Sequence, residues 1–193
     1  MKGGDWLTRD VPDVFTPERL TDEHRLVAQT AAEFVSKEVL PQVATLEQKN
    51  FPLVRSLLKQ CGDLGLIGTD VPERLGGVGL DKVASVLVTE AIGAYASFAT
   101  AFGAQSGLAI IPLLCFGNAD QQQRYLPRIV SGDLLGAYCL SESGSGSDAL
   151  SARARATRAS DGSWRLTGEK LWITSGGFAD MFIVFAKVDG EQF

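Results

Sequence analysis

The chain has 193 residues, of which 45% are hydrophobic and 21% are charged. These proportions are ordinary for a folded domain and exclude the apolar-poor, highly charged composition of a disordered chain. The net charge of −5 supplies no basic surface for phosphate groups, so the sequence argues against nucleic acid and anionic membranes as partners.

The three cysteines, Cys61, Cys115 and Cys139, form no C-x-x-C pair. Each lies in an apolar or mixed neighbourhood, which indicates reduced core thiols in a cytoplasmic protein. The first ten residues lack the apolar stretch of a secretory signal, and no later run approaches the roughly 20 apolar residues of a membrane span. The most apolar window, 108–116, contains a proline and predicts a buried, kinked helix.

The first 130 residues have the apolar spacing of helices. Thr21 is a suitable N-cap for a helix that runs toward Pro41, and His24, the only histidine, is expected to be solvated in its first turn. Asn118 is the expected N-cap of an amphipathic helix that the Ser131-Gly132 pair closes. The other helices are expected over 52–64 and, as one or two closely packed helices at the bundle centre, over 81–116.

After Gly132 the pattern changes to short strand-like runs separated by turn residues. Ser160-Asp161-Gly162-Ser163 predicts a hairpin, because Asp-Gly readily adopts positive φ angles. We therefore expect an α+β fold, with an all-α helical domain over 1–132 and an incomplete antiparallel β domain over 133–193. The sequence stops directly after a strand, so we expect a piece of a longer protein. The expected strands are 134–140, 153–159, 163–167, 171–174 and 181–188.

Two segments carry residues suited to a ligand. Ser141-Glu-Ser-Gly-Ser-Gly-Ser-Asp148 joins two expected strands, and its glycines and serines can gather N–H and hydroxyl donors around an anion or a polar ring edge. A flexible linker has the same composition and is the alternative. In Gly168-Glu-Lys-Leu-Trp-Ile-Thr-Ser-Gly-Gly177 a core position is usual for such bulky residues, but the following glycines let a ligand approach the backbone closely.

These segments resemble two signatures of the acyl-CoA dehydrogenase family. Residues 138–148 are similar to the family's strand that runs into a T-E-P-x-A-G-S-D loop, and residues 170–175 are similar to its K-x-W-I-T-N strand. In the first half, residues 72–80 resemble the family's P-E-x-x-G-G-x-G loop, and residues 117–132 resemble its helix with a Q-x-x-R-Y-L-P core. The resemblance extends from Phe15 to the end, and the acidic, extended start is most similar to the very-long-chain branch.

The resemblance implies an FAD cofactor and an acyl-CoA substrate. The Ser141 hydroxyl would hydrogen-bond the pyrimidine edge of FAD, and Ser147 would lie near both the pyrophosphate and the substrate. Trp172 would pack beside the isoalloxazine, and the Thr174 hydroxyl would approach N5, the atom that receives hydride. The implied cofactor-binding residues are Tyr138, Leu140, Ser141, Gly146, Ser147, Trp172, Ile173 and Thr174.

This sequence departs from the family pattern at several positions. Ser143 replaces a usual proline and Ser145 a usual alanine, and both changes are expected to loosen the loop. Ser175 replaces an asparagine and removes its amide. The family's catalytic base is a carboxylate in a C-terminal helical domain, so no catalytic residue is expected in this chain, and Glu142 is expected to be structural.

We therefore expect part of an FAD-dependent dehydrogenase of fatty acid β-oxidation, with electron-transfer flavoprotein as electron acceptor and a homo-oligomeric parent protein. The chain alone is expected to retain FAD weakly and to be inactive. No cluster has metal-ligand spacing, and no serine has a histidine partner for a hydrolase triad. The alternatives are a non-catalytic interaction module of the same descent, and an acyl-CoA oxidase or flavin monooxygenase of the same architecture.

Overall fold

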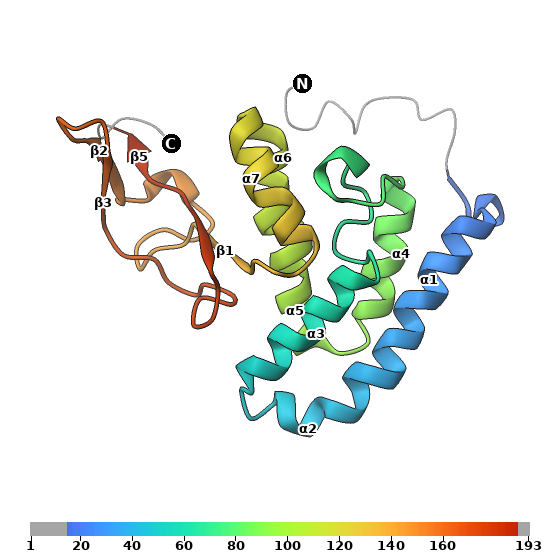
Figure 1. The fold of residues 1–193 in the computed structure, drawn as a ribbon. Coiled ribbons are helices and arrows are strands. Elements are labelled where there is room, and N and C mark those ends of the chain that lie inside the picture. Colours follow the sequence, from blue (N-terminus) through green and yellow to red (C-terminus); the bar gives the residue numbers. More distant parts are fainter. Residues whose placement is uncertain (1–14, 189–193) are drawn as a thin grey trace.

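The computed structural model describes residues 15–188 and shows a helical part joined to a smaller β part (Figure 1). The expected α+β class is confirmed. The acidic start, which suggested the very-long-chain branch, lies outside the described residues. The α-helices of the described chain are α1 (Asp22–Phe34), α2 (Val43–Leu46), α3 (Phe51–Asp63), α4 (Lys82–Ile92), α5 (Ala96–Gly103), α6 (Ile110–Phe116) and α7 (Ala119–Val130).

The start of α1 is tied to the start of α4. Thr21 caps α1, since its hydroxyl accepts from the His24 N–H while its own N–H donates to His24 Nδ1, both at 3.2 Å. The other ring nitrogen, Nε2, lies 2.9 Å from Oδ1 of Asp81, which caps α4 by accepting from the Ala84 N–H. His24 is only 6% exposed. The expectation of a solvated histidine is therefore wrong, because α4 packs over it.

The segments α5, Ala104–Ala109 (a π-helix) and α6 form one continuous helix, Ala96–Phe116. This helix has 21 residues, and its most apolar stretch of 18 residues has a mean hydropathy of 1.6 and is 33% buried, so by length and composition it could span a membrane. The expectation that no run reaches this length is wrong, because the helix continues through Pro112 after the wider π-helical turns. In this fold the helix packs against α4, α7 and the first strand, β1 (Gly136–Cys139).

One face of the long helix is uncovered within residues 15–188. Leu108 and Ile111 are 45% and 49% exposed, and Phe116 is 88% exposed. Cys115 is exposed as well, whereas the other two cysteines are buried. The expectations of a buried helix and of three core thiols are therefore wrong for this face, since a helix in this part of the bundle has neighbours on one side only.

The helix α7 begins and ends where the sequence predicts. Asn118 Oδ1 accepts from the Gln121 N–H and Gln121 Oε1 accepts from the Asn118 N–H, both at 2.9 Å, which is a capping box. Gly132 follows the last turn with φ 75°, the left-handed conformation that closes many helices. A Cβ at this glycine would lie 2.9 Å from the Leu58 carbonyl oxygen, so the end of α7 also packs tightly on α3.

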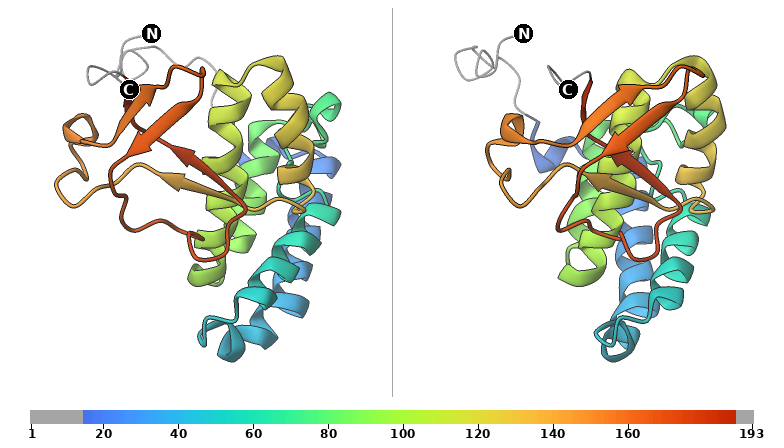
Figure 2. Two further views of the ribbon diagram at one scale, coloured as in Figure 1. Left: turned by 60° about the vertical axis from the view of Figure 1, so that its left-hand side comes forward. Right: turned by 90° about the vertical axis from the view of Figure 1, so that its left-hand side faces the viewer.

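The β part consists of two small sheets, and only one of their pairings is antiparallel (Figure 2). β1 pairs in parallel with β4, and β2 pairs in parallel with β5, while β2 and β3 form the predicted hairpin with Gly162 at φ 84° in its turn. The expected antiparallel arrangement is therefore wrong for two pairings. The long connection 168–180 reverses the chain after β3, so that β4 runs parallel to β1 and β5 runs parallel to β2. The strands are β1 (Gly136–Cys139), β2 (Arg155–Arg158), β3 (Trp164–Thr167), β4 (Met181–Val184) and β5 (Lys187–Val188).

Residues 171–174, predicted as a strand, form no strand: Trp172 lies in a bend, and a turn begins at Thr174. Trp172 and Ser175 have φ angles of 58° and 63°, in the left-handed region that interrupts a strand. The Gly176 N–H donates to the Ile173 carbonyl at 3.0 Å. The bulky, β-branched composition of this segment is therefore overridden by contacts made elsewhere in the fold.

Gln105, buried on the long helix, joins the helical part to β1. Its Nε2 donates to the carbonyls of Ile129 and Leu134 at 2.8 and 2.9 Å, and its Oε1 accepts from the Gly136 N–H at 2.9 Å. Gly136 lies so close to the helix that a Cβ there would be 2.4 Å from the Cβ of Ala109. The helix therefore fixes the position of β1, and the candidate site begins where β1 ends.

Candidate functional site

A depression of about 190 Å³ lies beside the end of β1, and six of the eight predicted cofactor-binding residues line it. A pocket for a whole small-molecule ligand usually has roughly 300–1,000 Å³, so this depression suits one part of a larger ligand. Its lining residues are Leu108, Tyr138, Leu140, Ser141, Leu171, Trp172, Ile173 and Thr174.

Lys170 joins the two segments that line the depression. Its ammonium donates to the Leu140 carbonyl at 2.9 Å and to Glu142 Oε1 at 2.7 Å. One residue further on, the Leu171 N–H donates to the Ser141 carbonyl at 2.9 Å. These three bonds hold the segment after β1 against the segment before Trp172, so the predicted residues on either side share one wall.

Glu142 is held by three donors. Besides Lys170, the N–H groups of Arg153 and Ala154 donate to its carboxylate, the latter at 2.9 Å. The Lys170 hydrogen bond, followed by that of the Arg153 N–H, lowers the pKa of Glu142 to about 2. A carboxylate stabilised so strongly as an anion is a weak general base at neutral pH. These contacts support the predicted structural role of Glu142.

The Gly/Ser loop after β1 is a structured turn and not a flexible linker. Glu142 and Ser145 exchange two backbone hydrogen bonds of 2.9 and 3.1 Å, and Ser145 Oγ donates to the Asp148 carbonyl at 2.8 Å. Ser143 Oγ lies 3.2 Å from Glu169 Oε1. Both hydroxyls therefore bind other parts of the loop or the facing segment, and the looser loop expected from the loss of proline and alanine stays a prediction.

Two glycines of this loop are not required by its own packing. Gly144 and Gly146 lie outside the left-handed region, and a Cβ at either position would meet no described atom within 4 Å. Their backbone is therefore open toward the exterior of residues 15–188, and the absence of side chains lets a ligand approach closely.

The predicted polar contacts are divided between the depression and the loop. Ser141 and Thr174 line the depression, whereas Gly146 and Ser147 lie outside it. Within the described residues the hydroxyls of Ser141, Ser147 and Thr174 make no hydrogen bond. Trp172 is 92% exposed, so it is not a core residue of this part of the chain. Together the depression and the loop offer these three serine and threonine hydroxyls and the exposed ring of Trp172, and Tyr138 adds a second aromatic ring with its own hydroxyl.

Two family models match the chain. The acyl-CoA dehydrogenase N-terminal domain matches residues 21–133, and the acyl-CoA dehydrogenase middle domain matches residues 137–192. The chain belongs to the acyl-CoA dehydrogenase family. All four segments that resemble the family in the sequence fall inside these matched ranges. The depression described above lies in the part that the middle-domain model covers, with Leu108 added from the N-terminal domain.

Relatives of known name agree with this family membership. A probable acyl-CoA dehydrogenase of Bacillus subtilis is 46% identical over all of this chain, which spans 33% of that protein. A crystal structure of a Bacillus anthracis acyl-CoA dehydrogenase complexed with FAD is 47% identical with a TM-score of 0.92, covering 99% of this chain and 33% of that one. A structure described as the electron transferring flavoprotein of Acidaminococcus fermentans is 31% identical, with a TM-score of 0.79, covering 89% and 45%.

None of the eight predicted residues lines another of the larger depressions found within residues 15–188. A larger depression of about 460 Å³ lies between α1 and α3, but none of the eight predicted residues lines it. Within residues 15–188 no three His, Cys, Asp or Glu side chains are arranged to hold a metal ion. The wall beside β1 is therefore the candidate site, since six of the eight residues predicted from the motifs line its depression.

Three residues of this wall were missed from the sequence: Leu108, Lys170 and Leu171. Leu108 contributes an apolar side chain from the long helix, and no local signal distinguishes it from the other leucines of that helix. Lys170 stands in the quoted motif, and its position two residues before Trp172 could have suggested a supporting role. Its partner Glu142 lies 28 positions earlier, so the pairing itself required the fold.

Proposed function

We propose that this chain supplies the flavin-facing wall of an FAD-dependent enzyme that dehydrogenates acyl-CoA thioesters. One observation carries the proposal: the hydroxyls of Ser141 and Thr174 line one depression together with Trp172, which is 92% exposed. An exposed aromatic face beside hydroxyls without partners in the described chain suits a planar, polar-edged ring system.

The residues of the wall fit part of a dinucleotide better than a small solute. The depression accommodates only one portion of a ligand, and the open backbone at Gly144 and Gly146 extends the accessible surface beyond it. Backbone N–H groups without neighbouring side chains suit a pyrophosphate. In this arrangement the ring of the dinucleotide would lie in the depression. Its pyrophosphate would lie along the loop, next to Ser147.

When bound, FAD supplies the acceptor for the hydride. The chain's own residues bind and orient: Thr174 and Ser141 offer hydroxyl donors to the ring edge, and Trp172 covers part of the ring against water. No carboxylate lines the depression, so the base that removes the substrate proton is supplied by another part of the protein. Since the chain spans 33% of the Bacillus subtilis relative, the complete activity belongs to the longer protein.

Electron-transfer flavoprotein is the proposed acceptor of the electrons. The similarity to a structure described as an electron transferring flavoprotein supports a place in flavin-to-flavin electron transfer. A homo-oligomeric full-length protein and a boundary between a helical domain (1–132) and a flavin-facing domain (133–193) complete the proposal. The boundary is supported by the change from helices to strands after α7.

The decisive experiment uses the full-length protein. We expect it to purify with FAD and to lose the visible absorbance of the flavin when an acyl-CoA is added without oxygen. Thr174→Val should slow this reduction about ten-fold or more, because a donor to the flavin is removed. Thr100→Val is the matched control, since the Thr100 hydroxyl bonds only to the Ala96 carbonyl of its own helix.

Two results would contradict the proposal. One is full-length protein that neither contains nor takes up FAD. The other is a Thr174→Val variant whose flavin is reduced as fast as that of Thr100→Val. Reduction by acyl-CoA followed by rapid reoxidation in air would instead favour the oxidase chemistry of the same architecture.

A further inference from the structure

We propose that Arg55, on α3 of the helical part, is a positioning residue that fixes the Trp172–Thr174 segment from its C-terminal side. This inference rests on the proposed function, because the segment matters as the flavin-facing part of the wall. Arg55 lies 123 positions before its first partner and belongs to neither motif that identified the site.

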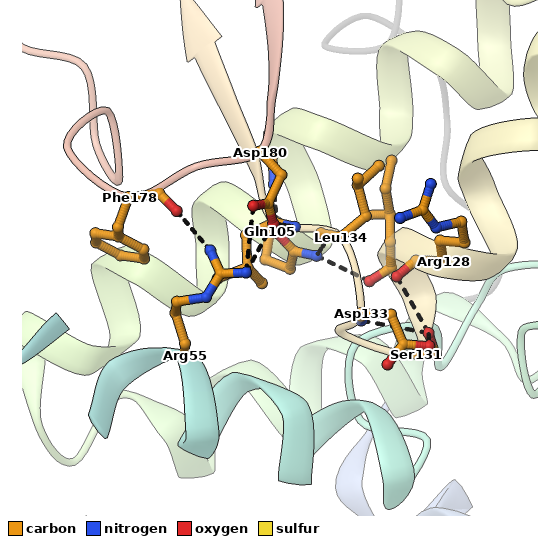
Figure 3. Close-up of polar contacts among 11 residues, drawn as sticks. Arg55, Gln105, Arg128, Ser131, Asp133, Leu134, Phe178 and Asp180 are labelled. Carbon is orange, nitrogen blue, oxygen red and sulfur yellow. Dashed lines mark hydrogen bonds and ion pairs between the residues drawn. The ribbon is translucent and has the colours of Figure 1, made fainter. Parts of the chain in front are cut away.

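The Arg55 guanidinium makes three hydrogen bonds to the segment that precedes β4 (Figure 3). Nη1 donates to the Phe178 carbonyl at 2.6 Å, and Nη2 lies 3.2 and 3.0 Å from the two carboxylate oxygens of Asp180. The planar guanidinium thus bonds a backbone carbonyl and a carboxylate at the same time. A lysine ammonium cannot reproduce this fork.

Asp180 is itself fixed to the beginning of β1. Its Oδ2 accepts from the Leu135 N–H at 2.9 Å, and its own N–H donates to the Leu135 carbonyl at 2.8 Å. Burial by itself raises the pKa of Asp180, but the bonds from Leu135 and Arg55 outweigh it and leave the pKa lowered. The partner of Arg55 is therefore a stable anion with a defined position.

An aromatic contact from the same helix reinforces the anchor. The rings of Phe51 and Phe178 stack with centroids 5.0 Å apart and an interplanar angle of 27°. The N–H groups of Phe178 and Ala179 both donate to the Ser175 carbonyl, at 3.0 and 2.9 Å. The anchor at Phe178 is thereby transmitted to Ser175, the residue directly after Thr174.

The flavin-facing segment is consequently held at both ends by different elements. Lys170 and the Leu171 N–H bind its N-terminal end to the loop after β1. Arg55 binds its C-terminal end to α3. Between these anchors Trp172 and Ser175 adopt left-handed φ angles, which persist only where the surroundings determine them. Releasing the Arg55 anchor should let the Thr174 hydroxyl leave its position in the wall.

Amide hydrogen exchange of Arg55→Met and Arg55→Lys tests the anchor without any flavin. We expect exchange at Gly176, Phe178 and Ala179 to accelerate about ten-fold or more, while Leu171, held from the other side, keeps its rate. Arg55→Lys retains the positive charge, and it is the variant to measure if Arg55→Met does not fold. Lys59→Met is the matched control, because Lys59 lies one turn further along α3 and pairs with Asp63 and Asp133.

The second readout is the flavin in the FAD-loaded full-length protein. We expect both Arg55 variants to shift its reduction potential and its visible absorption bands, and Lys59→Met to leave both unchanged. Equal exchange rates in the Arg55 and Lys59 variants would overturn the anchor. Faster exchange with an unaltered flavin would overturn the positioning role and leave Arg55 a structural residue. Failure of the wild-type protein to bind FAD would count against the proposed function, while the exchange rates would still report on the anchor.

Discussion

The Lys170 ammonium lies 2.7 Å from Glu142 Oε1, and both side chains are less than one-tenth exposed, at 9% and 8%. Glu142 also accepts from two backbone N–H groups, so the pair joins three parts of the wall. Removing one partner of this pair should lower the stability of the fold, because it leaves the other charge buried without a counter-ion.

Glu142→Gln should therefore lower the free energy of unfolding by about 2 kcal/mol, since it leaves the Lys170 charge buried without its anion. Chemical denaturation measures this loss. Glu33→Gln removes a carboxylate from the exposed Glu33–Lys37 pair on α1 and should change stability little. Equal effects of the two substitutions would show that the Lys170–Glu142 pair has no special weight.

The pH dependence of stability should report on the same carboxylate. The pKa of Glu142 is lowered from 4.5 to about 2 in the folded chain, so the unfolded chain binds its proton at higher pH than the folded chain. The stabilisation is complete above 4.5 and is lost as the pH falls from 4.5 toward 2. Denaturation curves at about pH 6 and about pH 3 should differ less for Glu142→Gln than for the wild type. An identical difference would contradict the assignment.

Gln105→Leu should destabilise the chain by about 2 kcal/mol, because the buried Leu134 carbonyl and Gly136 N–H lose the Gln105 side chain as partner, while the Ile129 carbonyl still accepts from the Gly132 N–H. Thermal unfolding measures the loss. Gln29→Leu is the control, since Gln29 is exposed on α1 and bonds only to Glu33. A Gln105 variant as stable as the Gln29 variant would show that the link between the long helix and β1 is dispensable.

Gly136→Ala should cost about 2 kcal/mol, because the added methyl group would lie 2.4 Å from the Ala109 Cβ and overpack the contact. Combining it with Ala109→Gly should restore part of this loss, since the methyl group then moves from one partner to the other. Gly144→Ala, in open space, should leave the stability of the chain unchanged. Absence of rescue in the double variant would place the strain elsewhere.

Much of the helical part could be predicted because its signals are local. The caps Thr21 and Asn118 and the closing Gly132 act within one turn of the residues that they terminate, and each is found as expected. His24 shows where local reasoning ends. Its position in a first turn suggests solvent, but its partner Asp81 lies 57 residues away, and only tertiary packing brings the two together.

The motifs predicted which residues form the candidate site, but not the contacts that hold those residues in place. Ser141 and Thr174 line one depression, which agrees with the roles that the resemblance implied. The strand expected around Trp172 fails because intrinsic β-propensity is weaker than the bonds that hold both ends of that segment. Arg55 carried no signal, since its contact with Asp180 spans 125 positions and a surface arginine on an amphipathic helix is ordinary.

Because Trp172 is exposed, its fluorescence can report when the wall is covered. Of the tryptophans in the described residues, Trp164 is 52% exposed in a hairpin strand, and Trp172 is 92% exposed in the wall of the depression. Any molecule or polypeptide segment that covers the wall moves the Trp172 indole out of water and alters its emission, while Trp164 still emits beside it. With Trp6 and Trp164 both replaced by phenylalanine, the change in Trp172 emission would report in real time when this wall is covered.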